Sequence, residues 1–289
     1  MKLALGTVQF GLAYGVANTQ GQVSLPVAAE ILRAAQQAGI DTLDTAIAYG
    51  NSEDCLGQMG VESFRVISKL PALPSDVADV STWVAQHVAG SLARLKLDCL
   101  DGLMLHRPAD LLGVHGRALA EALDHVVSSG QAQAVGISIY DPTELDQIWP
   151  IWQPQIIQSP LNVFDQRLIS SGWLMRLADA GVRVHTRSAF LQGLLLMPQA
   201  QRPAYFAPWQ AVLADFAAWC RTADISPLQA CLSFAQSFAA VERVVFGVDQ
   251  VEQLNQIVAA AQQPIDTDWS IWAQTDRALI EPSRWHLNT

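Results

Sequence analysis

Short apolar segments alternate eight times with helical patterns along this sequence, and that alternation predicts an α/β fold, a closed (β/α)8 TIM barrel. Two further observations favour this fold class. A glycine separates a helical pattern from a strand-like one at Gly39, Gly130 and Gly181, as expected where a left-handed residue ends a helix. No linker, low-complexity tract or block of charge divides the 289 residues, so we expect a single domain over residues 1–289. An open doubly wound sheet, which also alternates, is the remaining alternative.

The first two expected elements are a strand and a helix. Leu3–Leu5 is a short apolar strand, and PVAAEILRAAQQA predicts a helix over 26–38 with an apolar stripe at helical spacing. Ser24 stands near its N-cap, Pro26 suits its first turn and Gly39 ends it. The same reasoning gives eight strands: Leu3–Leu5, Thr42–Asp44, Arg65–Lys69, Gly102–Leu105, Ala134–Ser138, Ile156–Gln158, Val182–Thr186 and Arg243–Phe246.

The last segment, residues 263–289, differs from the rest. It is polar, with Trp269, Trp272 and Trp285 interspersed, and we expect an ordered, irregular cap on the barrel. The tryptophans either anchor this tail or line a substrate pocket, and the sequence leaves both interpretations open.

Composition excludes several classes of function. The formal net charge is −10 and the 17 basic residues are dispersed, which argues against nucleic acid and against anionic membrane surfaces. No apolar run approaches the roughly 18–20 residues needed to span a bilayer, and the N-terminus lacks the apolar region of a secretory signal, so we expect a cytoplasmic protein. Four scattered cysteines without a CxxC pair indicate neither a disulfide framework nor a zinc site.

Four titratable residues stand at or just after the carboxyl ends of expected strands, where active sites of such barrels lie. They are Asp44 and Tyr49 after the second strand, Lys69 in the third and His106 after the fourth. A nearby ammonium lowers the pKa of a phenol from about 10, and a carboxylate keeps a buried lysine charged. Tyr49 is therefore a candidate general acid tuned by Lys69 and Asp44, with His106 as a donor that orients a carbonyl.

The segments LDTAIAYGNSEDCLG, VISKL and LMLHRP together resemble the three catalytic blocks of the aldo-keto reductases, in matching order. The resemblance covers nearly the whole chain. It implies a (β/α)8 barrel that reduces carbonyls with a nicotinamide cofactor, and a catalytic tetrad of Asp44, Tyr49, Lys69 and His106.

The resemblance also implies a cofactor held extended across the mouth of the barrel, which agrees with the lack of a GxGxxG motif after a strand. The cofactor-binding residues that it implies are Gly6, Thr7, Asp44, Ser138, Gln158, Arg187, Ser188, Phe190, Gly193, Gly247, Val248 and Gln253. No metal is implied.

Three departures from the family pattern qualify these expectations. Ile139 replaces an asparagine that contacts the cofactor amide in many members, and Arg187 stands where many members stack an aromatic ring on the nicotinamide. A guanidinium can also stack on a flat ring, or it can meet an anionic substrate. The segment around Gly247, Val248 and Gln253 lacks the basic contacts to a 2′-phosphate that NADP-preferring members commonly have, which weakens the case for NADPH. The general habit of the family still implies NADPH first, with NADH close behind.

Two other functions remain open. One is a cofactor-binding regulatory subunit with little turnover, and the other is a Schiff-base aldolase using Lys69. The substrate is expected to be a small carbonyl or alcohol, with Arg107, Tyr140, Trp269 and Trp272 as candidate contacts. A monomer is favoured.

Overall fold

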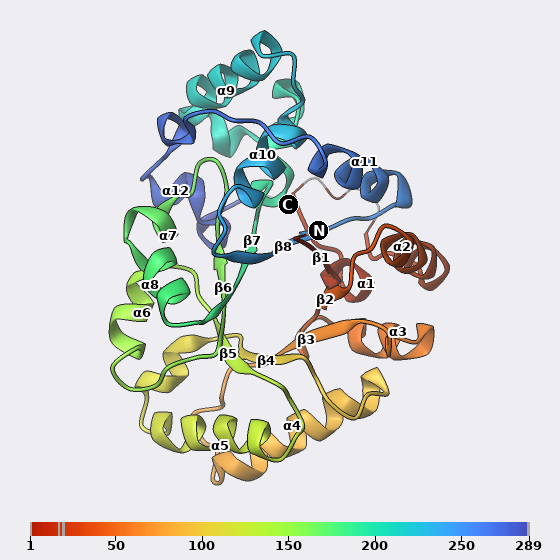
Figure 1. Ribbon diagram of the computed structural model, residues 1–289, viewed down its shortest axis with the longest axis vertical. Helices are drawn as coiled ribbons and strands as arrows, with labels where there is room; N and C mark the ends of the chain where they lie inside the picture. The colour runs from red at the N-terminus through yellow and green to blue at the C-terminus, as the bar shows by residue number, and fades with distance from the viewer. Residues whose placement is uncertain (1, 17, 19–20, 288–289) are drawn as a thin grey trace.

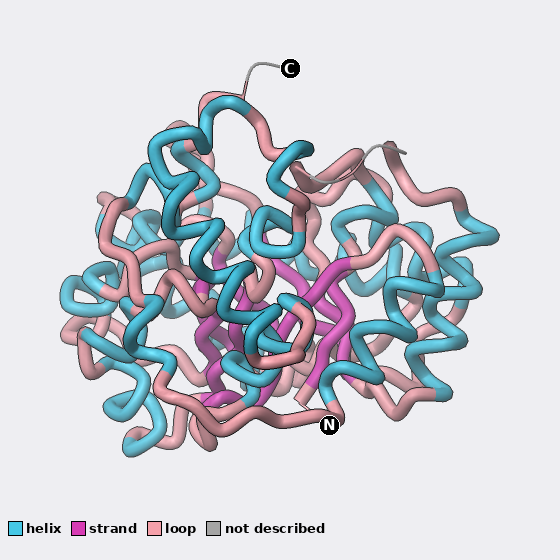
Figure 2. The backbone as a smooth tube through the Cα atoms, turned by 90° about the horizontal axis from the view of Figure 1, so that it is seen from above, coloured by secondary structure: helices cyan, strands magenta, loops and turns pink. Residues whose placement is uncertain are grey.

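A computed structural model describes residues 2–16, 18 and 21–287 of the chain. Eight parallel strands form a closed barrel in sequence order, each hydrogen-bonded to the next (Figure 1). The ring closes where β8 pairs with β1, in a register that sets Leu3 beside Val244 and Gly6 beside Gly247. Figure 2 shows the strands gathered at the centre with helices and loops around them. The predicted fold class is confirmed.

The strands lie within two residues of their predicted bounds at each end. They are β1 Leu3–Gly6, β2 Thr42–Asp44, β3 Arg65–Leu70, β4 Gly102–Leu105, β5 Val135–Ser138, β6 Ile156–Pro160, β7 Arg183–Arg187 and β8 Val241–Gly247. Most of their residues are buried, as expected for a parallel sheet covered by helices on one face and filled by side chains on the other. The sequences of β1, LALG, and β4, GLML, are accordingly apolar throughout.

The helices that surround the barrel are α1 Val8–Gly11, α2 Leu25–Gln37, α3 Ser52–Met59, α4 Val80–Leu95, α5 Gly116–Ser128, α6 Thr143–Ile148, α7 Arg167–Ser170, α8 Trp173–Asp179, α9 Gln210–Thr222, α10 Pro227–Gln236, α11 Val251–Ala261 and α12 Arg277–Ile280. Gly39, Gly130 and Gly181 adopt positive φ angles of 78°, 77° and 70°, so the three predicted junctions have the left-handed geometry that ends a helix. No described helix is both long enough and apolar enough to cross a membrane.

The two faces of β3 show how the strands position side chains. Ser68 points outward, because its hydroxyl donates to Glu53 of α3, whereas Ile67 and Lys69 alternate with it and point into the barrel. Ile67 packs there with Met104, Ala134 and Ile156 in a small apolar cluster separate from the main core. Lys69 stands one step nearer the carboxyl end of the barrel, above this cluster.

The tail runs through two short 3₁₀ helices, Trp269–Trp272 and Pro282–Arg284, with α12 between them. Trp269 and Trp272 are each only 8% exposed. Their rings pack edge-on or tilted against Phe216 and Trp219 of α9 and Phe234 of α10. The tail is thus held by aromatic packing on the outer helices.

Candidate active site

The four predicted catalytic residues meet at the carboxyl end of the barrel. Asp44 ends β2 and Lys69 is the penultimate residue of β3, while His106 follows β4 directly. Tyr49 lies in the turn between β2 and α3, where its backbone N–H donates to the carbonyl of Ala46. Parallel pairing of β2, β3 and β4 therefore brings together residues that are 62 positions apart in sequence.

Lys69 and Asp44 form a buried ion pair. The ammonium Nζ lies 2.8 and 2.7 Å from the two carboxylate oxygens and also donates to the carbonyl of Thr45 at 3.0 Å. The Lys69 side chain is fully buried and Asp44 is 4% exposed. Burial alone would lower the pKa of Lys69, but the charge and hydrogen bonds of Asp44 outweigh it and raise that pKa above its ordinary value. The lysine is held as an ammonium.

Tyr49 lies against both Lys69 and His106. The Lys69 ammonium is 5.2 Å from the centroid of the phenol ring, and the rings of Tyr49 and His106 are edge-on with centroids 5.7 Å apart. Burial raises the pKa of Tyr49, and the positive charges of Lys69 and Arg187 offset only part of this rise. The prediction that Lys69 lowers the pKa of Tyr49 is correct for that one interaction. The net shift of the pKa is nevertheless upward, because burial has the larger effect. The phenol keeps its proton and is a donor.

His106 is held neutral. Burial is the main cause, and the nearby charges of Lys69 and Arg187 add to it, so that the pKa of the imidazole falls to about 4. At neutral pH the ring therefore carries one N–H and can donate one hydrogen bond without adding a charge to the site.

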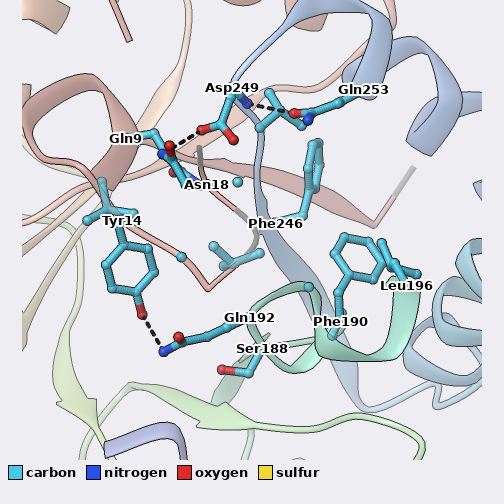
Figure 3. Close-up of a pocket in the computed structure, with 18 of the residues that line it drawn as sticks. Gln9, Tyr14, Asn18, Ser188, Phe190, Gln192, Leu196, Phe246, Asp249 and Gln253 are labelled. Atoms are coloured by element: carbon cyan, nitrogen blue, oxygen red, sulfur yellow. Dashed lines mark hydrogen bonds between the residues drawn. The ribbon is translucent and has the colours of Figure 1, made fainter. Parts of the chain in front are cut away.

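An open cleft of about 840 Å³ runs from this cluster across the mouth of the barrel (Figure 3). Asp44 and Tyr49 line one part of it, and the side of the barrel formed by β7, β8 and β1 lines the remainder. The predicted cofactor residues that line it are Gly6, Thr7, Asp44, Gln158, Arg187, Ser188, Phe190, Gly193, Gly247, Val248 and Gln253. Ser138 is not among the lining residues, but its hydroxyl donates to Gln158 Oε1 at 3.3 Å. Gln158 in turn donates to Asp44 at 2.7 Å.

Arg187 stands over the same end of the cleft. Its Nη2 donates to the carbonyl of Ile139 at 3.1 Å, and its guanidinium carbon lies 4.5 Å from the centroid of the Tyr140 ring. The side chain is thereby fixed between β5 and β7, with its charge near Tyr49 and His106.

The four candidate substrate contacts lie in different surroundings. Tyr140 is 41% exposed and stacks on Arg187 beside the cleft. Arg107 is tied down by Asp110 and by the carbonyl of Leu73. Trp269 and Trp272 do not line the cleft, because their rings are packed into the aromatic cluster of the tail. For these two the packing supports the anchoring interpretation.

Several cleft residues were missed from the sequence. They are Gln9, Tyr14, Asn18, Gln192, Asp249 and Gln256. Two contacts tie the loop after α1 to other parts of the rim: Gln192 donates to the Tyr14 hydroxyl at 3.2 Å, and Asn18 donates to Asp249 at 3.3 Å. Gln9 and Gln256 lie on α1 and α11, Gln192 lies in the 3₁₀ segment Leu191–Leu196, and Tyr14, Asn18 and Asp249 lie in loops.

The cleft has features that fit a dinucleotide. Phe190, Leu196 and Phe246 supply flat and apolar walls (Figure 3). Gln9 Oε1 is buried beside the cleft without a hydrogen-bond partner among the described residues. The turn from Ser188 to Gly193 holds four residues at positive φ, including the non-glycine residues Ser188, Leu191 and Gln192. Backbone strain of this kind clusters where loops clamp a ligand.

Among residues 2–16, 18 and 21–287, no group of three or more histidine, cysteine or acidic side chains is arranged to hold a metal ion. The four described cysteines, Cys55, Cys99, Cys220 and Cys231, are free thiols.

Comparison with known proteins connects this geometry to a family. The model of the "Aldo/keto reductase family" matches residues 2–276. A 6-dehydroglucose reductase of Novosphingobium aromaticivorans is 35% identical over 199 residues, covering 61% of this chain and 62% of that protein. A probable voltage-gated potassium channel subunit beta of rice, Oryza sativa subsp. japonica, is 25% identical over 202 residues, covering 64% and 61%. The chain thus spans about three fifths of the length of these curated relatives.

A solved structure agrees on the fold. The holo form of an aldo-keto reductase from Bacillus halodurans superposes with a TM-score of 0.75 at 19% identity, covering 96% of this chain and 94% of the other.

Proposed function

The chain belongs to the aldo/keto reductase family, and we propose that it is an NAD(P)-dependent oxidoreductase that reduces an aldehyde or ketone to an alcohol, reversibly. The observation that carries the proposal is the cluster of Asp44, Lys69, Tyr49 and His106, with its buried ion pair, at one end of a cleft large enough for a dinucleotide. When bound, the dinucleotide supplies the hydride that the carbonyl carbon accepts.

The residues of the chain supply and place the proton. Tyr49 donates its phenol proton to the carbonyl oxygen, and the Lys69 ammonium stabilises the phenolate that remains. Asp44 keeps Lys69 charged through a contact with both carboxylate oxygens, and both side chains are buried. Neutral His106 donates a hydrogen bond to the same carbonyl oxygen and orients it toward Tyr49. Gln158, Ser138 and the turn from Ser188 to Gly193 would hold the cofactor.

Substitution of Tyr49 tests the acid. Tyr49→Phe should lower kcat for reduction of 4-nitrobenzaldehyde by about 10²- to 10⁴-fold while leaving dinucleotide affinity unchanged, because only the proton donor is lost. The control is Tyr205→Phe, which removes a remote hydroxyl that donates to the carbonyl of Ala278 and should keep wild-type turnover. Equal turnover in wild type and Tyr49→Phe would rule out the phenol as the acid.

A regulatory subunit that binds the dinucleotide and turns over slowly is the second candidate, favoured by the similarity to a probable channel subunit. It predicts measurable binding with little turnover even in the wild type. The aldolase alternative is weaker, since a Schiff base needs a neutral amine and the pKa of Lys69 is raised by Asp44.

A further inference from the structure

We propose that Asp249 makes the cleft select a dinucleotide whose adenosine ribose carries a free 2′-hydroxyl, NADH, and reject the 2′-phosphate of NADPH. The inference rests on the proposed function, because it concerns the cofactor of that same site. It reverses the order of cofactors expected from the sequence.

The topology identifies which part of the cleft receives the adenosine. The reacting ring must lie beside Tyr49, over β2. From there the barrel register leads outward through Gly6 of β1, beside Asp44, to Gly247 of β8, beside Gly6. Beyond Gly247 the cleft continues over the loop from β8 to α11. The end of an extended dinucleotide that is remote from the reaction therefore lies along this loop.

Asp249 lies in this loop and lines the cleft together with Gln253 and Gln256 of α11. Figure 3 shows Asp249 and Gln253 together at one side of the cleft, with Tyr14 and Gln192 at the opposite side. The backbone N–H of Asp249 donates to Gln253 Oε1 at 2.7 Å, and its carboxylate accepts from Asn18 at 3.3 Å. These contacts fix the position of the carboxylate on the wall.

Among the residues that the structure describes, no cation offsets this carboxylate. In the described part of the chain, no lysine or arginine forms an ion pair with Asp249, and Arg187 is the only basic side chain that lines the cleft. Arg187 is engaged at the catalytic end, with Ile139 and Tyr140. A 2′-phosphate at the other end would bring up to two negative charges to a carboxylate whose described partner, Asn18, is uncharged.

The same carboxylate suits a ribose hydroxyl. A carboxylate accepts a hydrogen bond from a 2′-hydroxyl, which is the interaction that distinguishes NAD from NADP in other dinucleotide folds. The N-terminus of α11, two residues beyond Asp249, attracts anions, but Asp249 itself already provides the negative charge there. The helix end therefore does not favour a second anion.

The test is calorimetric titration of the purified chain with NADH and NADPH, and with ADP-ribose and its 2′-phosphorylated form. The last two lack nicotinamide, so their binding reports on the adenosine end alone. We expect wild type to bind each unphosphorylated ligand at least about tenfold more tightly than its phosphorylated counterpart. Asp249→Asn should tighten binding of the phosphorylated ligands by about tenfold or more and change the others by less than about threefold.

The matched control is Asp98→Asn, the same change at an exposed carboxylate before β4, at the opposite face of the barrel. It should alter no affinity. Equal binding of NADH and NADPH by wild type, or a preference that persists in Asp249→Asn, would overturn the inference and leave the reductase proposal intact. If neither dinucleotide binds wild type, the proposed function itself fails, and the inference with it.

Discussion

His106 has a pH signature that can be measured without cofactor or substrate. Its pKa is about 4 in the folded protein, mainly because it is buried, and near 6.5 in an unfolded chain. Between these values the unfolded state binds more protons than the folded state, so stability falls as pH is lowered through this window. Between pH 7 and pH 5 we expect this one group to cost about 1–2 kcal/mol of unfolding free energy. His106→Gln should remove that part of the decrease, as measured by urea unfolding at the two pH values.

Other groups titrate in the same window, so the comparison needs a histidine that is exposed. His125 of α5 is exposed, and His125→Gln should retain the full decrease between pH 7 and pH 5. If wild type and His106→Gln lose equal stability over this range, the imidazole is not held neutral by its surroundings.

At the scale of single residues, the sequence locates the site better than its surroundings. Asp44, Lys69 and His106 were found because strand ends can be read from apolar periodicity. The net pKa direction of Tyr49 could not be read, since it depends on how deeply the ring is buried. Tyr14 comes from a loop whose path is set by tertiary contacts such as the one with Gln192.

At the scale of elements, helix α3, which follows Tyr49, packs against α4 through a glycine and a buried carboxylate. A Cβ placed on Gly57 would lie 1.9 Å from the backbone carbonyl oxygen of Arg94. The backbones of the two helices are therefore in close contact at Gly57. Beside this contact, Glu53 accepts hydrogen bonds from Ser68 at 2.5 Å and Ser91 at 2.6 Å and pairs with Arg94 at 2.7 Å. Helix α3 is thereby fixed to both β3 and α4.

Gly57→Ala should therefore force α3 and α4 apart and lower the unfolding free energy by about 2 kcal/mol. Gly90→Ala is the matched control, because Gly90 lies inside α4 and its Cβ would meet only side-chain atoms of Arg94, the nearest at 3.1 Å, and no backbone atom of a neighbouring helix. That change should be neutral or should stabilise by up to about 1 kcal/mol through helix propensity. Urea unfolding of both variants measures the difference, and equal effects would contradict a close contact at Gly57.

Most elements were predictable, and the exceptions share a cause. The eight strands and the helix at 25–37 follow from hydrophobic pattern and from the stops at Gly39, Gly130 and Gly181. The 3₁₀ segments Leu191–Leu196 and Ala204–Trp209 have no such signal, because they are shorter than the window in which a period can be recognised.

At the scale of the whole molecule, the tail joins parts of the chain that are far apart in sequence. Gln274 donates its backbone N–H to the carbonyl of Phe164, and the Gln166 side chain donates to the carbonyl of Trp269. The order of the tail was expected from its tryptophans. Their role remained open because an aromatic residue in a polar segment is equally suited to a pocket and to an anchor, and only the position of α9 and α10 distinguishes the two.

Arg167 of α7 contacts three carboxylates, from three regions of the chain: Asp165 at 2.8 Å, Asp141 at 3.0 Å and Glu281 of the tail at 2.5 Å. The Arg167 side chain is only 17% exposed. Removing its positive charge therefore leaves the negative charges of three largely buried carboxylates partly unneutralised. Arg167→Met should lower the unfolding free energy by about 2 kcal/mol, less than for a fully buried pair, and speed proteolysis of the tail after residue 263. Arg117→Met, which breaks an exposed ion pair on α5, should change neither. A tail equally resistant to protease in both variants would show that aromatic packing alone holds it, and that Arg167 serves only the loops after β5 and β6.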